Sequence, residues 1–247
     1  SSWNIDLVEK ASIQTAIEMR ATGSHWTFAP NIDLARDPRW GRVGETFGED
    51  THLVGEMGVA MIQGLQQGYF TSKNTVVANA KHWAAGGEPL TGINLSPMDV
   101  SMRTLYEDFF PPFEGAIEAG VFTFMAAHNE INGEPAHGSK FLLTEVLRED
   151  WNFDGFVVSD WMDVSRLHTF HKVAENPKEA VYQTVDAGMD MNMHGPNFAP
   201  YVLELVKEGR LSERRIDDSV RPILTAKFRL GLFEKSIVDK EVSKDSI

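Results

Sequence analysis

The chain has no cysteine among its 247 residues, which excludes disulfides, thiolate nucleophiles and cysteine-ligated metal sites. Positive charge is also scarce, because 23 Lys and Arg residues stand against 36 Asp and Glu residues, a formal net charge of −13. Nucleic acids and anionic membranes need a basic face, so neither partner is expected. No run of about 18 apolar residues occurs, so we expect no membrane-spanning helix.

What is present is ordinary for a globular protein, with 42% hydrophobic and 24% charged residues. This length suits one large α/β domain or two small ones. The first residues lack a basic segment followed by an apolar one, which indicates a mature or truncated N-terminus. We favour a periplasmic or secreted location over a cytoplasmic one.

Apolar patterns along the chain predict helices and strands in alternation. Phe156, Val157 and Val158 are typical of a parallel strand buried on both faces. Pro111 and Pro112 must break or kink the helix that begins near residue 100. The other predicted strands are 25–34, 76–80, 121–126 and 189–193, and the other predicted helices are 5–22, 51–67, 139–150, 177–187, 197–208 and 212–230.

Repeated strand–loop–helix units without a tight Asn-Gly hairpin predict a parallel sheet with crossover helices. No glycine-rich phosphate loop occurs at a strand–helix junction, and polar residues cluster after every strand. This arrangement favours a (β/α)8 TIM-type barrel over residues 1–233. The chain opens on a helix and shows five strands, so we expect a barrel incomplete at its N-terminal end. Residues 234–247 are interpreted as a polar tail or the start of a linker to a missing second domain.

Polar residues at the strand ends would converge on one rim of such a barrel. Asp160 follows the strand 156–158, and Arg42, Lys81, His82, His128 and His194 follow other predicted strands or their loops. Each has a structural alternative. Asp160 could cap a helix, Arg42 could belong to a solvated ion-pair loop, and His128 and His194 could be structural histidines. A functional role is favoured for Lys81, because a lysine seldom stands at the end of a buried strand without a partner.

One carboxylate among cationic donors suits a particular chemistry. Lys and Arg near a carboxylate lower its pKa, and an ionised carboxylate can attack an anomeric carbon or stabilise an oxocarbenium-like transition state. The remaining donors could bind sugar hydroxyls, and Trp83 and Trp161 could offer apolar faces to the ring. The residues by themselves thus favour a glycosidase.

Four separated segments add a family resemblance. They are Pro30–Arg42 (PNIDLARDPRWGR), Lys81–Trp83 (KHW), Asn129–Gly133 (NEING) and Val157–Trp161 (VVSDW). Together they resemble the N-terminal barrel domain of glycoside hydrolase family 3. The resemblance implies that Asp160 is the nucleophile of a retaining mechanism. It also implies that Arg42, Lys81 and His82 bind the sugar in the innermost subsite.

The chain departs from the family pattern in three places. Nothing matches the Asp-Ala-Val-His-Gly-like segment of the family's first strand, and His128-Asn129 stands where many members have Tyr-Asn. The loop after His82 also lacks the KHFPGHG pattern of the branch that carries its acid/base on this domain. We therefore expect the acid/base Glu on a C-terminal domain that is missing from the chain. We expect the 247-residue chain to be stable only together with the missing barrel strands and the second domain.

These observations predict a retaining, exo-acting β-glycosidase without a cofactor or metal. We favour a β-glucosidase acting on small β-glucosides or oligosaccharides, with a β-xylosidase or another family 3 exo-glycosidase as the alternative and a homodimer as an option. His128, Trp161 and His194 are expected in the pocket wall or in support of Asp160. Two rival hypotheses are an inactive sugar-binding fragment and a metal-dependent barrel hydrolase with His82, His128, His194 and Asp160 as ligands.

Overall fold

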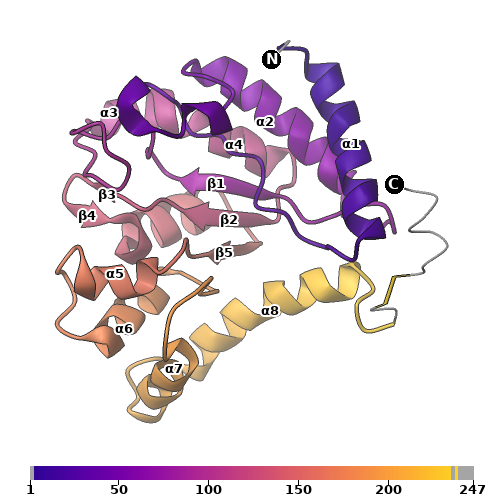
Figure 1. Ribbon diagram of the computed structural model, residues 1–247. Helices are drawn as coiled ribbons and strands as arrows, with labels where there is room; N and C mark the ends of the chain where they lie inside the picture. Colours follow the sequence, from indigo (N-terminus) through magenta and orange to yellow (C-terminus); the bar gives the residue numbers. More distant parts are fainter. Residues whose placement is uncertain (1–2, 235–236, 239–247) are drawn as a thin grey trace.

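The computed structural model describes residues 3–234 and 237–238. A parallel sheet of three strands lies at its centre, in the order β1 (Asn79–Trp83), β2 (Thr123–Ala126) and β5 (Phe156–Val158). Asn79 pairs with Thr123, which pairs with Phe156, and almost every residue of the three strands is buried. The strands point the same way, so their carboxyl ends share one edge (Figure 1).

Two extended segments flank this sheet where regular strands were predicted over 25–34 and 189–193. Asn31 makes an isolated parallel bridge with Lys81, and Met191 makes one with Val158. Pro30 has no N–H to give to a ladder, and the Asp190 carboxylate takes the N–H of Val157 at 2.8 Å. Both segments therefore lie along the sheet without forming full strands. The described residues show an α/β fold with a parallel sheet and not a closed barrel.

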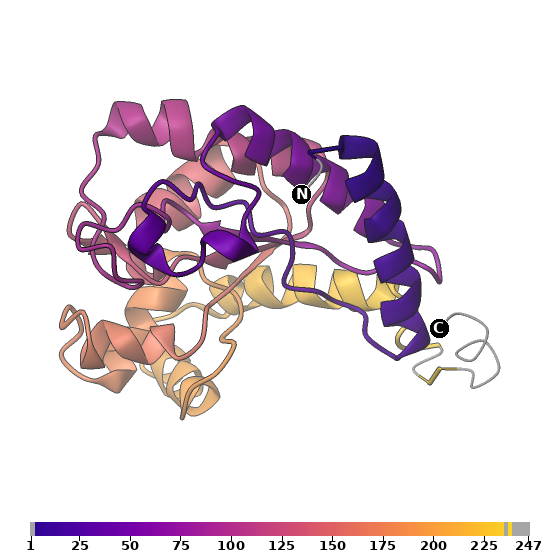
Figure 2. The same ribbon diagram turned by 45° about the horizontal axis from the view of Figure 1, so that its top comes forward.

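Helices cover both faces of the sheet. In both views α1 (Ile5–Ala21), α2 (Thr51–Gln66) and α4 (Pro111–Glu118) lie on one side, and α8 (Glu213–Arg229) lies on the other (Figures 1 and 2). The remaining helices are α3 (Met102–Thr104), α5 (Asp163–Thr169), α6 (Pro177–Ala187), α7 (Phe198–Lys207), the π-type segments Leu105–Phe109 and Phe141–Asp150, and the 3₁₀ turns Pro38–Trp40, Val43–Glu45 and Ala136–Gly138. No helix in the described part of the chain combines the length and apolarity needed to cross a membrane.

Most predicted helices are confirmed, and their ends follow local chemistry. Asp50 caps α2 by accepting the N–H of Leu53 at 2.8 Å, as an acidic N-cap residue commonly does. Pro111 occupies the first turn of α4, so the expected break in the preceding helix is confirmed. Helix α5 was not predicted as a separate element. It matters for the site, because it carries a second carboxylate close to Asp160.

A short antiparallel hairpin contradicts the expected absence of an Asn-Gly turn. Strand β3 (Glu130–Ile131) pairs with β4 (Glu134–Pro135) around Asn132 and Gly133, whose φ values are 52° and 86°. Positive φ at both positions is the requirement of a type I′ turn, which Asn-Gly meets most readily. The prediction was wrong because flanking strands of two residues each are too short to show an alternating pattern.

Trp83 lies in the core, which overturns the suggestion that it offers a face to a sugar. Its side chain is 0% exposed, and its indole N–H donates to the carbonyl of Leu142 at 3.1 Å. Rings of Phe110 and Trp151 lie 4.8 and 5.1 Å from its centroid. An apolar ring surrounded in this way stabilises the layer between sheet and helices, and no ligand can reach it.

Candidate active site

The carboxylate of Asp160 lies at the carboxyl edge of the sheet, just after β5. Gly155 allows β5 to approach β2 closely, because a Cβ on it would lie 2.1 Å from the carbonyl oxygen of Phe122. The backbone N–H of Asp160 donates to Nε2 of the buried His137 at 2.9 Å. Burial lowers the pKa of His137, so its ring is neutral and can accept this bond. The main chain of Asp160 is therefore fixed by the buried ring of His137.

Both oxygens of the Asp160 carboxylate receive hydrogen bonds. Oδ1 accepts the backbone N–H of Trp161 at 2.6 Å, and Oδ2 lies 2.9 Å from Nε2 of His128. Burial tends to raise the pKa of Asp160, but the hydrogen bond and charge of His128 hold it well below the ordinary value. Asp160 is thus ionised at neutral pH, as a nucleophile requires.

His128 connects Asp160 to a second carboxylate on α5. Its Nδ1 lies 2.6 Å from Oδ2 of Asp163, whose other oxygen accepts a hydrogen bond from Arg166. Burial by itself would lower the pKa of His128, but the hydrogen bonds to Asp160 and Asp163 and the charges of these carboxylates outweigh burial and raise the pKa to about 9. Burial by itself would raise the pKa of Asp163, but the neighbouring histidines and Arg166 outweigh burial and hold this pKa below its ordinary value. Charges therefore alternate along Asp160, His128, Asp163 and Arg166.

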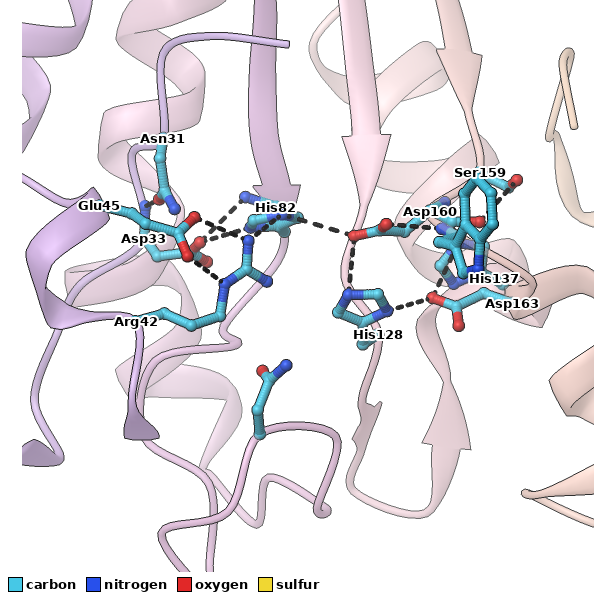
Figure 3. A network of polar contacts seen from close by, with 12 residues as sticks. Asn31, Asp33, Arg42, Glu45, His82, His128, His137, Ser159, Asp160 and Asp163 are labelled. Carbon is cyan, nitrogen blue, oxygen red and sulfur yellow. Dashed lines mark hydrogen bonds and ion pairs between the residues drawn. The ribbon is translucent and has the colours of Figure 1, made fainter. Parts of the chain in front are cut away.

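His82 lies on the opposite side of Asp160 and connects to a different carboxylate (Figure 3). Its Nδ1 donates to Oδ2 of Asp33 at 2.7 Å, and its Nε2 lies 3.1 Å from Nη2 of Arg42. Because a guanidinium only donates, Nε2 accepts from Arg42 and the ring is neutral. Nε2 is also 3.5 Å from Oδ2 of Asp160. Arg42 is held in turn by Glu45, with two bonds of 2.9 Å.

Lys81 brings an ammonium group to the same edge. Within the described residues its Nζ has no hydrogen-bond or ion-pair partner, so its donors face the site unused. Burial lowers the pKa of Lys81, with Arg42 acting in the same direction. Asp33 also keeps one buried oxygen, Oδ1, without a partner. A ligand rich in hydroxyl groups could accept hydrogen bonds from the Lys81 ammonium, whereas the Asp33 side chain is 0% exposed and out of a ligand's reach.

Trp161 and His194 form a separate, exposed wall. Their rings stack with centroids 4.0 Å apart and 6° between planes, and Trp161 is 53% exposed. The structure thus gathers six predicted site residues around one edge, with Arg42, Lys81, His82, His128 and Asp160 in a polar cluster and Trp161 beside it. His194 joins them only through its stack on Trp161.

Sequence reasoning left four supporting residues out of the site: Asp33, His137, Asp163 and Arg166. Asp163 and Arg166 had a usable signal, because they follow Asp160 at steps of three, the spacing that places side chains on one helical face. His137 had none, since a turn of three residues brings it beneath Asp160. Asp33 lies inside the family-like segment Pro30–Arg42, but the segment gave it no separate role.

Among the described residues, one group has ligand atoms close enough for a metal: His128, Asp160 and Asp163. Both ring nitrogens of His128 already bind these two carboxylates, so neither offers a free lone pair. His82 is likewise engaged at both nitrogens, and His194 stacks on Trp161. The donor set fits a hydrogen-bonded chain better than a metal centre.

Comparison with known proteins agrees with the site's chemistry. The family model described as glycosyl hydrolase family 3 N terminal domain matches residues 1–226. A beta-xylosidase of Formosa agariphila is 44% identical over 95% of this chain and 34% of its own length. A periplasmic beta-glucosidase of Salmonella typhimurium is 37% identical over 94% of this chain and 30% of its own length.

A solved structure shows the same architecture. A β-glucosidase involved in saponin metabolism from intestinal bacteria aligns with a TM-score of 0.95 at 43% identity, covering 100% of this chain and 33% of that one. The chain spans about a third of the length of the curated relatives it matches. By its family match, its relatives and its fold, this chain belongs to glycosyl hydrolase family 3, as an N-terminal domain of that family.

Proposed function

We propose that this chain is the nucleophile-bearing part of a retaining, exo-acting β-glycosidase, and that Asp160 is its nucleophile. One observation carries the proposal: an ionised carboxylate at the carboxyl edge of a parallel sheet, with both oxygens oriented by donors. Lys81 and Arg42 stand beside it as cations able to bind hydroxyl groups. The complete (β/α)8 barrel and the domain boundary near residue 233 belong to the same proposal.

In the first step Asp160 attacks the anomeric carbon, and the departing oxygen takes a proton from a carboxylic acid outside this chain. In the second step water attacks the same carbon, and the bond to Asp160 breaks with its electron pair returning to the carboxylate. The outside carboxylate now takes the proton of the water. Retention follows from two displacements at one centre.

Glycone binding falls to Arg42, Lys81 and His82 in this proposal. The unused ammonium of Lys81 supplies direct donors, and Arg42 is fixed by Glu45. Both ring nitrogens of His82 are engaged within the protein, so His82 contributes chiefly by orienting Arg42 around the sugar. Trp161 and His194 form the wall that the leaving group would pass.

The acid/base residue is assigned to a C-terminal domain of the full-length protein, because the chain spans about a third of its relatives. Glucose is the favoured glycone, and xylose is the second candidate because a relative at 44% identity is named a beta-xylosidase. A periplasmic or secreted location is proposed, in line with the named location of the Salmonella relative.

Trapping of the glycosyl-enzyme tests the proposal. The full-length protein is incubated with 2-deoxy-2-fluoro-β-glucosyl fluoride or its xylosyl counterpart, and its intact mass is measured. Fluoride leaves without protonation, so the reaction depends on the nucleophile and not on the acid. We expect one glycosyl adduct that is absent in Asp160→Asn. An adduct on another residue would refute the assignment, and saccharide binding without any adduct would favour an inactive sugar-binding protein.

The metal-dependent alternative is separable in the same assay. If a chelator abolished turnover and added zinc restored it, the carboxylate mechanism would be wrong. The hydrogen bonds of His82 and His128 to carboxylates predict that turnover is unchanged by chelation.

A further inference from the structure

His128 is held between two ionised carboxylates. Its Nε2 lies 2.9 Å from Asp160 and its Nδ1 lies 2.6 Å from Asp163, and an ionised carboxylate can only accept. Arg166 also donates to Asp163, which keeps that group ionised. Both ring nitrogens of His128 therefore carry protons, and the ring is a cation whose proton on Nε2 points at Asp160.

We infer that His128 is a positioning residue whose principal effect falls on the second chemical step, the release of the sugar from Asp160. The inference rests on the proposed function, since it requires that Asp160 form a glycosyl ester. Asp163 and Arg166 hold the imidazolium in place from α5.

The reason lies in the charge of Asp160 during the reaction. Asp160 is neutral in the ester and becomes an anion again as its bond to the anomeric carbon breaks. An imidazolium already 2.9 Å from Oδ2 stabilises that developing charge without having to move. His128 keeps its proton throughout, because the proton of the attacking water goes to the outside carboxylate. In the first step the same cation stabilises the anion before attack, so it favours release more than attack.

Geometry gives His128 a second effect. The N–H of Trp161 binds Oδ1 of Asp160, and His128 binds Oδ2, so the carboxylate cannot rotate freely. The ring of His128 is itself fixed at Nδ1 by Asp163, and its side chain is only 14% exposed. Loss of the ring would leave Asp160 oriented by one donor only.

The protonation of His128 gives the step a pH limit. The pKa of about 9 in the free enzyme depends on two anions, and ester formation removes one of them. The pKa of His128 in the glycosyl-enzyme is therefore lower than in the free enzyme, so sugar release loses the assistance of the cation at a lower pH than the one at which the free enzyme loses its proton. The charged or titratable groups around the ring are Asp160, Asp163, Arg166, His82 and His137.

The test measures how long the trapped enzyme lasts. Full-length protein is labelled with 2-deoxy-2-fluoro-β-glucosyl fluoride, freed of excess reagent, and followed by intact mass and returning activity at several pH values. We expect His128→Phe to form the adduct and to lose it about 10 to 100 times more slowly than wild type. His128→Gln, which keeps an uncharged donor, should fall between the two.

Two further variants separate the effect from structural damage. Asp163→Asn keeps the ring and removes the anion behind it, so we expect the alkaline limit of sugar release to move to lower pH. His168→Gln is the control, because His168 lies on the same helix as Asp163 but points elsewhere. The Nδ1 atom of His168 is 3.0 Å from the carbonyl oxygen of Ala174. The release rate of His168→Gln should equal that of wild type.

Each result has a clear meaning. Release from His128→Phe at the wild-type rate would overturn the inference and leave the proposed function intact. If that variant failed to fold, an unchanged alkaline limit in Asp163→Asn would overturn the inference equally. Failure of the wild-type protein to form any adduct with the glucosyl or xylosyl reagent would refute the proposed function, and the inference would fall with it.

Discussion

Two histidine–aspartate pairs flank Asp160 and have similar geometry, yet their histidine rings differ in protonation. His82 and Asp33 lie on one side, His128 and Asp163 on the other, with ring-to-carboxylate distances of 2.7 and 2.6 Å. The two imidazole rings have centroids 6.0 Å apart and planes inclined by 25°. Each ring directs its Nε2 toward the same oxygen of Asp160, at 3.5 and 2.9 Å.

The difference arises from what else reaches Nε2. At His82 that nitrogen faces the donor-only guanidinium of Arg42, so the ring is neutral and cannot donate to Asp160. At His128 no other described residue hydrogen-bonds to Nε2, so this nitrogen donates to Asp160 while Nδ1 donates to Asp163, and the ring is a cation. A histidine next to an aspartate therefore has no fixed role, since the partner of its second nitrogen decides its charge.

The largest expected effect is at Asp160, where the two pairs meet. Asp160→Asn keeps the size of the side chain and removes the nucleophile, so we expect kcat to fall by about 10⁴-fold or more in the full-length enzyme. Unfolding should remain cooperative, because Asn can still accept the N–H of Trp161. A variant that retained a tenth of the activity would show that both pairs serve some other residue.

The next effect is a pH dependence of stability that belongs to the His128 pair. The pKa of His128 is raised from 6.5 to about 9 on folding, so its stabilising contribution is complete below pH 6.5 and is lost as pH rises toward 9. We expect a loss on the order of 2 to 3 kcal/mol in the free energy of unfolding over that range. Denaturant titrations of wild type and His128→Phe measure it. Equal slopes with pH in both proteins would contradict the cationic ring.

The His82 pair should affect binding of the glycone. Arg42→Lys loses the paired bonds to Glu45 and the contact with His82, so we expect KM to rise by about 10-fold with a smaller change in kcat. Steady-state kinetics against a β-glucoside give both values. If Arg42→Lys instead slowed loss of the glycosyl adduct, it would be wrong to assign glycone binding to the His82 pair and sugar release to the His128 pair.

The smallest effect is expected outside both pairs. His194→Ala removes the ring stacked on Trp161 and should raise KM about two- to five-fold, since an exposed aromatic stack contributes roughly 1 kcal/mol. The pH limits of both chemical steps should not change. A shifted alkaline limit in this variant would mean that the wall and the His128 pair are coupled.

Much of the fold followed from local pattern. Helices α1, α2, α6, α7 and α8 lie within about two residues of their predicted bounds, because an apolar face and capping residues are local properties. The strands were less predictable. Segment 25–34 has the composition of a strand, but Pro30 prevents a full ladder. The hairpin around Asn132 and Gly133 escaped notice because its strands are so short.

The amino-acid sequence by itself determined the acidic charge, the α/β alternation and the family motifs that single out Asp160, Arg42, Lys81 and His82. These are local patterns or residue identities, and they survive without knowledge of distances. Only the tertiary structure decided that Trp83 is buried, that Asp33 and Asp163 support the two histidines, and that His128 is charged while His82 is neutral. Protonation depends on atoms from distant segments meeting within 3 Å or so, and that proximity is a property of the folded chain alone.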